Sequence, residues 1–404
     1  MMLKRKNLIV LSFLLIVGFF TFGSIGDLFA GDAIGVTDDQ VNIAHITAMT
    51  GPAAFVGNTM IKATKVFFLD VNEKGGIHGR KIKVFYEDNA YQPLKTVAAA
   101  KYLFSKRKIF GMVDVLGSAP AMALLPFIME RKVPTIIPSA RTAQTYIPPR
   151  RYVFVILTSS TVQGVVAMDY LIKDLKVKNL RIGCIHQDDQ YGNDAYRGIE
   201  KAAKKYGFEI TAEQVYKRGA VDFSSQVVNM KRAKPDYVYI SGIPGPTSGI
   251  LKEAYKLDWS PHFFGDGPSV TPKTIDLVGE AGKGLINVYE YGLGDEDIPG
   301  GNRLRKIVAK HAPEVKDIEA FFVWQWIANS VFLEGLKRSG RELTREGFVD
   351  ILNRMKDFDT GGLIAPISFR PDKKNGGGSA RMVKIDIKNR TYHPITGWRK
   401  PSVK

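Results

Sequence analysis

The sequence has a single cysteine, Cys184, among its 404 residues. One cysteine excludes an internal disulfide, even in an oxidising compartment. The residue lies in an apolar run, LRIGCIH (180–186), which is typical of a buried strand. We therefore expect a packed, inert thiol and not a catalytic nucleophile.

Motifs of catalysis and of metal binding are also lacking. The six histidines show no HExxH or other metal-ligand spacing, and no GxSxG nucleophile motif occurs. The densest acidic segment is HQDDQYGND (186–194), whose carboxylates either cap the following helix or form a catalytic pair. Because the segment is a loop between a strand and a helix, its carboxylates are well placed to cap that helix, and this interpretation is favoured. The sequence predicts no enzyme activity, no metal site and no cofactor.

No arginine-rich run interleaved with aromatic residues, the usual sign of nucleic-acid binding, occurs in the chain. The formal net charge is nevertheless +17. Such an excess suits a nucleic acid, an anionic ligand or an anionic surface. Because the basic residues are scattered, we interpret them as a generally basic surface and expect no nucleic-acid partner.

Long apolar runs are lacking apart from one near the N-terminus, at residues 8–20. Lys4, Arg5 and Lys6 precede it, and small and polar residues follow up to Ala30. This pattern predicts a secretory signal peptide over residues 1–30 and an exported protein. The alternative, an uncleaved membrane anchor, is less favoured because the run is shorter than the ~20 residues that span a bilayer.

What the rest of the chain does contain is an alternation of apolar strand patterns with amphipathic helix patterns. It begins with VNIAHITA (41–48) and KIKVFYED (81–88) and runs through two similar halves, with a seam between residues 150 and 163. Helices are expected over 302–355, and a closing β-hairpin is expected from LIAPISF (363–369) and ARMVKIDI (380–387). Such alternation is typical of doubly wound α/β sheets.

The glycine-rich segment KGGIHG (74–79) resembles a phosphate-binding loop in composition only. A phosphate loop follows a strand and opens a helix, whereas this segment closes a helix and precedes a strand. We therefore interpret its glycines as the end of the helix. The polar, Gly- and Ser-rich loops at the opposite ends of the strands are the expected ligand site of an α/β fold.

Six segments in a fixed order resemble the type I periplasmic binding proteins of the branched-chain amino acid (Leu/Ile/Val) transporter class. They are ITAMTGPAAFVGN, DVNEKGGIHGRKIKVFYEDN, QPLKTVAAAKYL, VPTIIPSA, HQDDQYGND and LIAPISF. The resemblance implies two Rossmann-like lobes with parallel sheets, joined by a three-stranded hinge. It places one lobe at residues 38–157 plus 288–360 and the other at 158–287 plus 361–404.

The resemblance also implies a set of ligand-binding residues. Ser118 matches the serine that meets a ligand carboxylate, and Tyr191 matches the aromatic residue that covers the ligand from the second lobe. The loop residues Ser139, Ala140, Arg141 and Thr142 match the segment that binds the same end of the ligand. Phe55 lies one place from the family's first-loop aromatic position.

Two departures from the family pattern bear on the ligand. The family's acidic partner for a ligand ammonium falls at Gly267, with only Asp266 nearby, and a second-lobe tyrosine is replaced by Ile243 or Pro244. A buried cation without a carboxylate is costly, so these departures disfavour a plain α-amino acid. Arg141 favours a carboxylate-bearing ligand, unless it is a solvated loop residue.

We therefore predict a periplasmic, monomeric solute-binding protein that delivers a small organic molecule to the ABC permease subunits of the inner membrane. A ligand-binding sensor module for a membrane signalling partner shares this fold and remains an alternative. An exported α/β enzyme is a further alternative.

Overall fold

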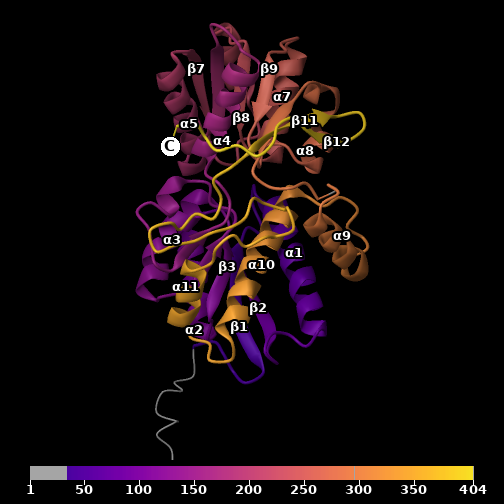
Figure 1. Ribbon diagram of the computed structural model, residues 1–404. Coiled ribbons are helices and arrows are strands. Elements are labelled where there is room, and N and C mark those ends of the chain that lie inside the picture. Colours follow the sequence, from indigo (N-terminus) through magenta and orange to yellow (C-terminus); the bar gives the residue numbers. More distant parts are fainter. Residues whose placement is uncertain (1–33, 295, 404) are drawn as a thin grey trace, which may run out of the picture. The chain divides into compact units, whose positions relative to one another are not determined.

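The computed structural model describes residues 34–294 and 296–403, so the predicted signal peptide lies outside the described residues. Within the described range, strands and helices alternate as the sequence predicts, and the strands form two sheets (Figure 1). The strands are β1 (Gln40–Thr47), β2 (Lys81–Asp88), β3 (Gly111–Val115), β4 (Thr135–Ile137), β5 (Val153–Val155), β6 (Arg181–Gln187), β7 (Glu209–Tyr216), β8 (Tyr237–Ser241), β9 (His262–Gly265), β10 (Ile286–Tyr289), β11 (Arg381–Asp386) and β12 (Thr391–Pro394). The α-helices are α1 (Ala54–Glu73), α2 (Pro93–Lys106), α3 (Ser118–Glu130), α4 (Ser160–Asp169), α5 (Gln190–Tyr206), α6 (Ser224–Arg232), α7 (Pro244–Lys256), α8 (Pro272–Val278), α9 (Pro299–His311), α10 (Ala320–Ser339) and α11 (Arg345–Asn353).

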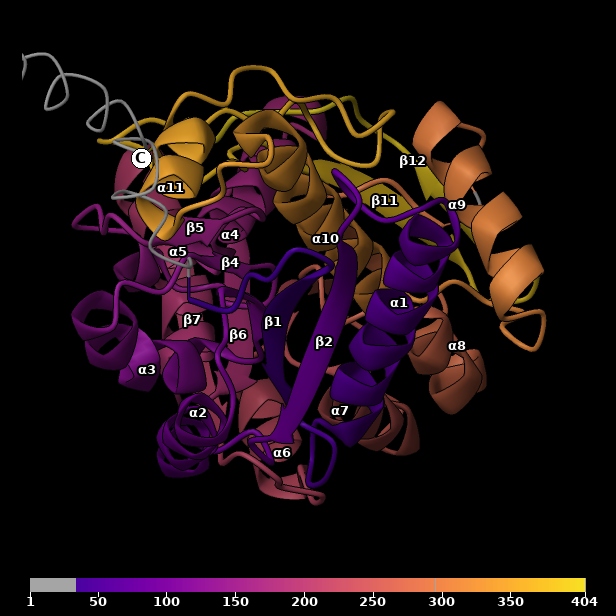
Figure 2. The same cartoon turned by 90° about the horizontal axis from the view of Figure 1, so that it is seen from below.

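The first sheet has the order β2-β1-β3-β4-β5, and all its described pairs are parallel. Its central strand β3 is covered on both faces, since every one of its residues is buried. Such two-sided burial needs helices on both sides. Figure 2 shows α1 and α10 on one side of β1 and β2, and α2 and α3 on the other. The apolar spacing that predicted α1 gives this helix its buried stripe, including Met60, Phe67 and Phe68.

The second sheet has the order β12-β11-β10-β9-β8-β6-β7. It is parallel from β10 to β7, whereas β11 and β12 are antiparallel additions at one edge. Cys184 lies in β6 with its side chain fully buried, and burial raises the pKa of its thiol well above the ordinary value. The predicted burial of this cysteine is confirmed.

The prediction of the closing hairpin is correct for residues 380–387 and wrong for their partner, residues 363–369. Residues 363–369, all of them described, form no strand and make only an isolated bridge between Ile367 and Phe358. The hairpin instead joins β11 to β12, with Lys384 opposite His393. The apolar run contains Pro366, which has no N–H to donate to a ladder. Its apolar side chains are buried in irregular chain, where Phe369 packs against Phe154 at 5.2 Å between ring centroids.

The glycine-rich segment ends α1 and turns the chain into β2, as predicted. The N–H of Gly76 donates to the carbonyl of Val71 at 2.9 Å, and the φ of Gly76 is +78°. A Cβ added there would lie 2.0 Å from the carbonyl oxygen of Arg80. Because only glycine fits this close left-handed turn, the glycine serves the fold and not a phosphate.

Three connections pass between the sheets in the described part of the chain: after β5, after β10, and between α11 and β11. The first and third lie side by side. The N–H of Val155 donates to the carbonyl of Lys374, and the N–H of Gly376 donates to the carbonyl of Val155, both at 2.8 Å. The second and third meet where Gly292 donates to the carbonyl of Leu363 at 2.6 Å.

Among the described residues, no helix combines the length and the apolar character needed to cross a membrane.

Candidate functional site

The carboxyl ends of the strands of both sheets supply the candidate site. Ser118 opens α3 after β3, and Ser139 and Arg141 follow β4. From the second sheet, Tyr191 lies in the first turn of α5 and Ile243 follows β8. The structure brings these five residues to one cavity of about 30 Å³, which we call the central cavity. Its other lining residues are Ala53, Val56, Tyr91, Leu116, Gly117, Pro268, Phe321 and Trp324.

The two serines of the central cavity are tied to the loops that hold them. The backbone N–H of Arg141 donates to the Ser118 hydroxyl at 2.9 Å. The Ser139 hydroxyl lies 2.7 Å from the carboxylate of Asp114 and 3.0 Å from the carbonyl of Val115. These contacts fix the loop after β4 against the end of β3, so that the Arg141 side chain is aimed between the two sheets.

Arg141 is buried, with 2% of its side chain exposed, so the interpretation as a solvated loop arginine is wrong. Its guanidinium forms an ion pair with the carboxylate of Glu290 and lies 4.0 Å from the ring centroid of Trp324. None of its three nitrogens makes a hydrogen bond of good geometry within the described residues. Buried donors are nearly always paired in folded proteins, so this guanidinium stands out as a group able to bind an anion.

Sequence reasoning missed Glu290, and apart from Tyr191 it also missed the aromatic lining residues, Trp324 among them. Glu290 follows directly after β10 and is fully buried. Burial raises the pKa of its carboxyl to about 7, while Arg141 opposes the shift. The available signal was an acidic residue at the end of the apolar run INVYEYG (286–292), a position where burial without a partner is costly.

Glu290 also fills the space beside Gly267, the position at which the resemblance implies an acidic side chain. A Cβ added to Gly267 would lie 2.7 Å from Glu290 Oε2. The N–H of Gly267 donates to Gln163 Oε1 at 2.7 Å. A carboxylate is therefore present at this place in the fold, but it comes from a different strand and faces an arginine.

Asp266 does not offer its carboxylate to the central cavity. It is fully buried and accepts from the hydroxyls of Tyr191 at 2.8 Å, Ser241 at 2.7 Å and Ser269 at 2.7 Å. Burial raises the pKa of this carboxyl, and the three hydroxyls oppose the shift. The Tyr191 hydroxyl is engaged in this network, so the ring of Tyr191 is the part of this residue left to cover a ligand.

The remaining predicted site residues lie close by without lining the central cavity. Phe55 is 39% exposed and packs edge-on against Phe321, with 6.3 Å between ring centroids. Ala140 is buried between its lining neighbours, and Thr142 begins a short 3₁₀ helix in which its side chain accepts from the N–H of Gln144.

Loops of the two sheets touch beside the central cavity, which Tyr91 lines. Arg218, after β7, donates to the carbonyl of Tyr91 at 2.7 Å, and its guanidinium lies 4.6 Å from the Tyr91 ring centroid. The same guanidinium pairs with Asp189 at 2.7 Å. Asp189 also caps α5, since its side chain accepts from the N–H groups of Tyr191 and Gly192. The capping interpretation of the acidic segment is thus confirmed for Asp189.

Among the described residues, no group of three or more His, Cys, Asp or Glu side chains is placed to hold a metal ion.

Known proteins resemble this chain in sequence and in fold. A family model described as periplasmic binding protein matches residues 40–391. The Leu/Ile/Val/Thr-binding protein of Salmonella typhimurium is 29% identical over 336 residues, which cover 82% of this chain and 87% of that protein.

Two solved structures share the fold, each with a TM-score of 0.82. One is a fatty acid ABC transporter substrate-binding protein from Thermomonospora curvata, 23% identical, covering 92% of this chain and 95% of that chain. The other is a branched chain amino acid ABC transporter protein from Thermus thermophilus with bound valine, 21% identical, covering 90% and 98%. At these identities the likeness extends to the fold alone.

Proposed function

The chain belongs to the periplasmic binding protein family, and we propose that it is the extracytoplasmic solute-binding component of an ABC importer. In this role it binds a small organic molecule between its two sheets and delivers it to permease subunits in the inner membrane. The names of similar proteins, a Leu/Ile/Val/Thr-binding protein and two ABC transporter proteins, support the role. The protein acts as a monomer in the periplasm after residues 1–30 are removed, and it catalyses no reaction.

The observation that carries the proposal is the buried guanidinium of Arg141, which has an ion-pair partner and an aromatic face but no hydrogen bond of good geometry. A ligand carboxylate offers two acceptors in the plane of the guanidinium, the arrangement that arginine binds best. Ser118 lies beside Arg141, and the rings of Tyr191 and Trp324 complete the enclosure. The ligand is thus a carboxylate with an apolar body.

The names of the relatives are consistent with that ligand class. Leucine, isoleucine, valine and fatty acids all carry a carboxylate on an apolar body. Glu290 balances the charge of Arg141 before a ligand binds. Its carboxylate pairs with the Arg141 guanidinium until a ligand carboxylate takes its place. Because the pKa of Glu290 is raised, the displaced carboxylate then accepts a proton.

Binding requires the lobes to separate, because a central cavity of about 30 Å³ holds little more than a water molecule. The lobes are residues 38–157 plus 288–360 and residues 158–287 plus 361–404. The lobes rotate apart at the three connections between the sheets. This opening breaks the hydrogen bond from Arg218 to the carbonyl of Tyr91. A ligand held by both lobes then favours the closed state, the form that the permease recognises.

A thermal-shift screen of residues 31–404 tests the proposal, with amino acids, primary amides, aromatic acids and dicarboxylates as probes. We expect a carboxylate to raise the melting temperature, since a ligand that binds only the folded state stabilises it by mass action. Alanine at Ser118 and at Tyr191 should then weaken that ligand. Unchanged affinity in both variants would refute the site, and turnover of the ligand would refute the absence of catalysis.

A further inference from the structure

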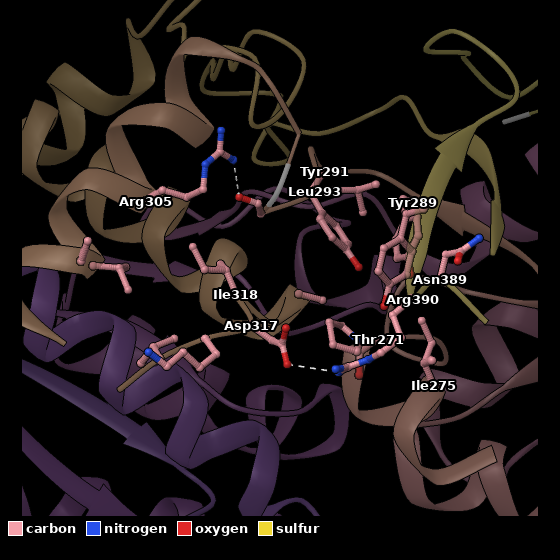
Figure 3. Close-up of a pocket in the computed structure, with 18 of the residues that line it drawn as sticks. Thr271, Ile275, Tyr289, Tyr291, Leu293, Arg305, Asp317, Ile318, Asn389 and Arg390 are labelled. Carbon is pink, nitrogen blue, oxygen red and sulfur yellow. Dashed lines mark hydrogen bonds and ion pairs between the residues drawn. The ribbon is translucent and has the colours of Figure 1, made fainter. Parts of the chain in front are cut away.

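A second cavity, of about 620 Å³, lies between elements of the two sheets, and we call it the side cavity (Figure 3). This volume is within the ~300–1,000 Å³ of small-molecule sites. Its walls come from the start of α8, the chain after β10 and the β11–β12 turn on one side, and from α9 and the chain leading to α10 on the other. The residues that the inference uses are Tyr289, Tyr291, Ala309, Lys316, Asp317 and Arg390.

The interior of the side cavity is aromatic and apolar. Tyr289 and Tyr291 are buried, with 4.9 Å between their ring centroids. Their hydroxyls donate to the carbonyls of Val270 and Gly267, so the rings close the inner end of the cavity and expose almost none of their own surface. Figure 3 shows Ile318 and Ile275 on facing walls. Such a lining suits a small apolar molecule.

The charged groups of the side cavity are mostly engaged with one another or with backbone. Arg390 pairs with Asp317 at 3.1 Å and with Asp276 at 2.8 Å, and Arg305 donates to the carbonyl of Gly294 at 2.7 Å. Lys316, in contrast, is exposed and has no ion pair among the described residues. An anionic group on the occupant would complement its ammonium.

A partition of two rings separates the side cavity from the central cavity. Tyr291 lines the first, Trp324 lines the second, and their ring centroids lie 5.8 Å apart in edge-to-face contact. The guanidinium of Arg141 stacks against Trp324, and neither residue lines the side cavity. A molecule in the side cavity therefore does not reach Arg141.

We propose that the side cavity is a second binding site, for a small aromatic or branched apolar acid whose carboxylate pairs with Lys316. Because its walls come from elements of both sheets, an occupant there stabilises the arrangement in which Arg390 meets Asp317. The site is distinct from the proposed carboxylate site at Arg141, and a ligand of one is not required to fit the other.

Calorimetric titration with phenylacetate and its neutral analogue phenylacetamide tests the side cavity. Ala309→Trp fills the mouth with a bulky ring at an exposed helix position, and Lys306→Trp adds the same ring to an exposed position of α9 outside the cavity. We expect Ala309→Trp to weaken phenylacetate at least tenfold and Lys306→Trp to change it less than twofold. Lys316→Met should weaken phenylacetate about two- to fivefold and leave phenylacetamide unchanged, as for an exposed ion pair.

Arg141→Met separates the two sites. If it leaves phenylacetate binding intact while Ala309→Trp abolishes it, the side cavity is the site. Loss of phenylacetate binding in Arg141→Met alone would place the molecule in the central cavity and overturn the inference, as would equal binding in Ala309→Trp and wild type. No binding of phenylacetate to the wild type up to its solubility limit would overturn it as well.

Discussion

Replacing Glu290 by glutamine should make the protein more stable at pH 8 and change its stability much less at pH 5. In the folded protein burial raises the pKa of this carboxyl to about 7, against 4.5 in the absence of structure. Between these values the unfolded chain loses a proton that the folded chain keeps, so the free energy of unfolding falls as the pH rises. The difference of about 2.5 between the two pKa values corresponds to about 3 kcal/mol.

Glutamine keeps the shape of the neutral carboxyl and cannot ionise, so Glu290→Gln escapes this loss. The free energy of unfolding from urea titration at pH 5 and pH 8 measures the effect, with the exposed Glu342→Gln as control. The buried carboxyl of Glu319, whose pKa is also raised to about 7, contributes equally to wild type and variant and cancels in the difference. If the ion pair with Arg141 were net stabilising, Glu290→Gln would instead be the less stable protein at pH 8, by about 3–5 kcal/mol. That result would refute the reasoning.

Two further substitutions test a connection between the sheets and a contact between their loops. Gly377→Ala should lower the free energy of unfolding in a urea titration by about 1–3 kcal/mol, because the new Cβ would lie 2.7 Å from the backbone nitrogen of Thr158. Gly378→Ala is the control, since its Cβ would meet nothing within 4 Å and should leave the free energy of unfolding unchanged. Arg218→Met should enlarge the radius of gyration in small-angle scattering, because it removes the contact with Tyr91; an unchanged radius would show that this contact does not hold the lobes closed.

Local patterns were sufficient to predict most of the fold. The alternation of KIKVFYED marks β2 at Lys81–Asp88, and the helical spacing of apolar residues marks α1, since both patterns depend on neighbours in the sequence. The prediction of the closing hairpin was wrong because an apolar run of this length can be buried either as a strand or as irregular chain. Residues 363–369 are buried as irregular chain, where Pro366 removes a ladder donor.

The candidate site was predictable only in part, for the same physical reason. The loop with Arg141 is visible in the sequence because it follows a strand at the ligand-binding edge of the sheet. Its partner Glu290 lies 149 positions further along and is brought there by a connection between the sheets. No pattern of neighbouring residues in the sequence predicts an ion pair between two residues so far apart. The side cavity, assembled from several distant segments, is likewise invisible in the sequence.

The most direct measurement is calorimetric titration of wild type and Arg141→Met with the acid that raises the melting temperature most, and with its primary amide. At pH 6 Glu290 is largely neutral, so the substitution leaves no unpaired buried carboxylate. We expect wild type to prefer the acid over the amide, Arg141→Met to bind the acid about a hundredfold more weakly, and the exposed Arg131→Met to match wild type. Equal affinity of wild type and Arg141→Met for the acid would contradict a carboxylate site at Arg141.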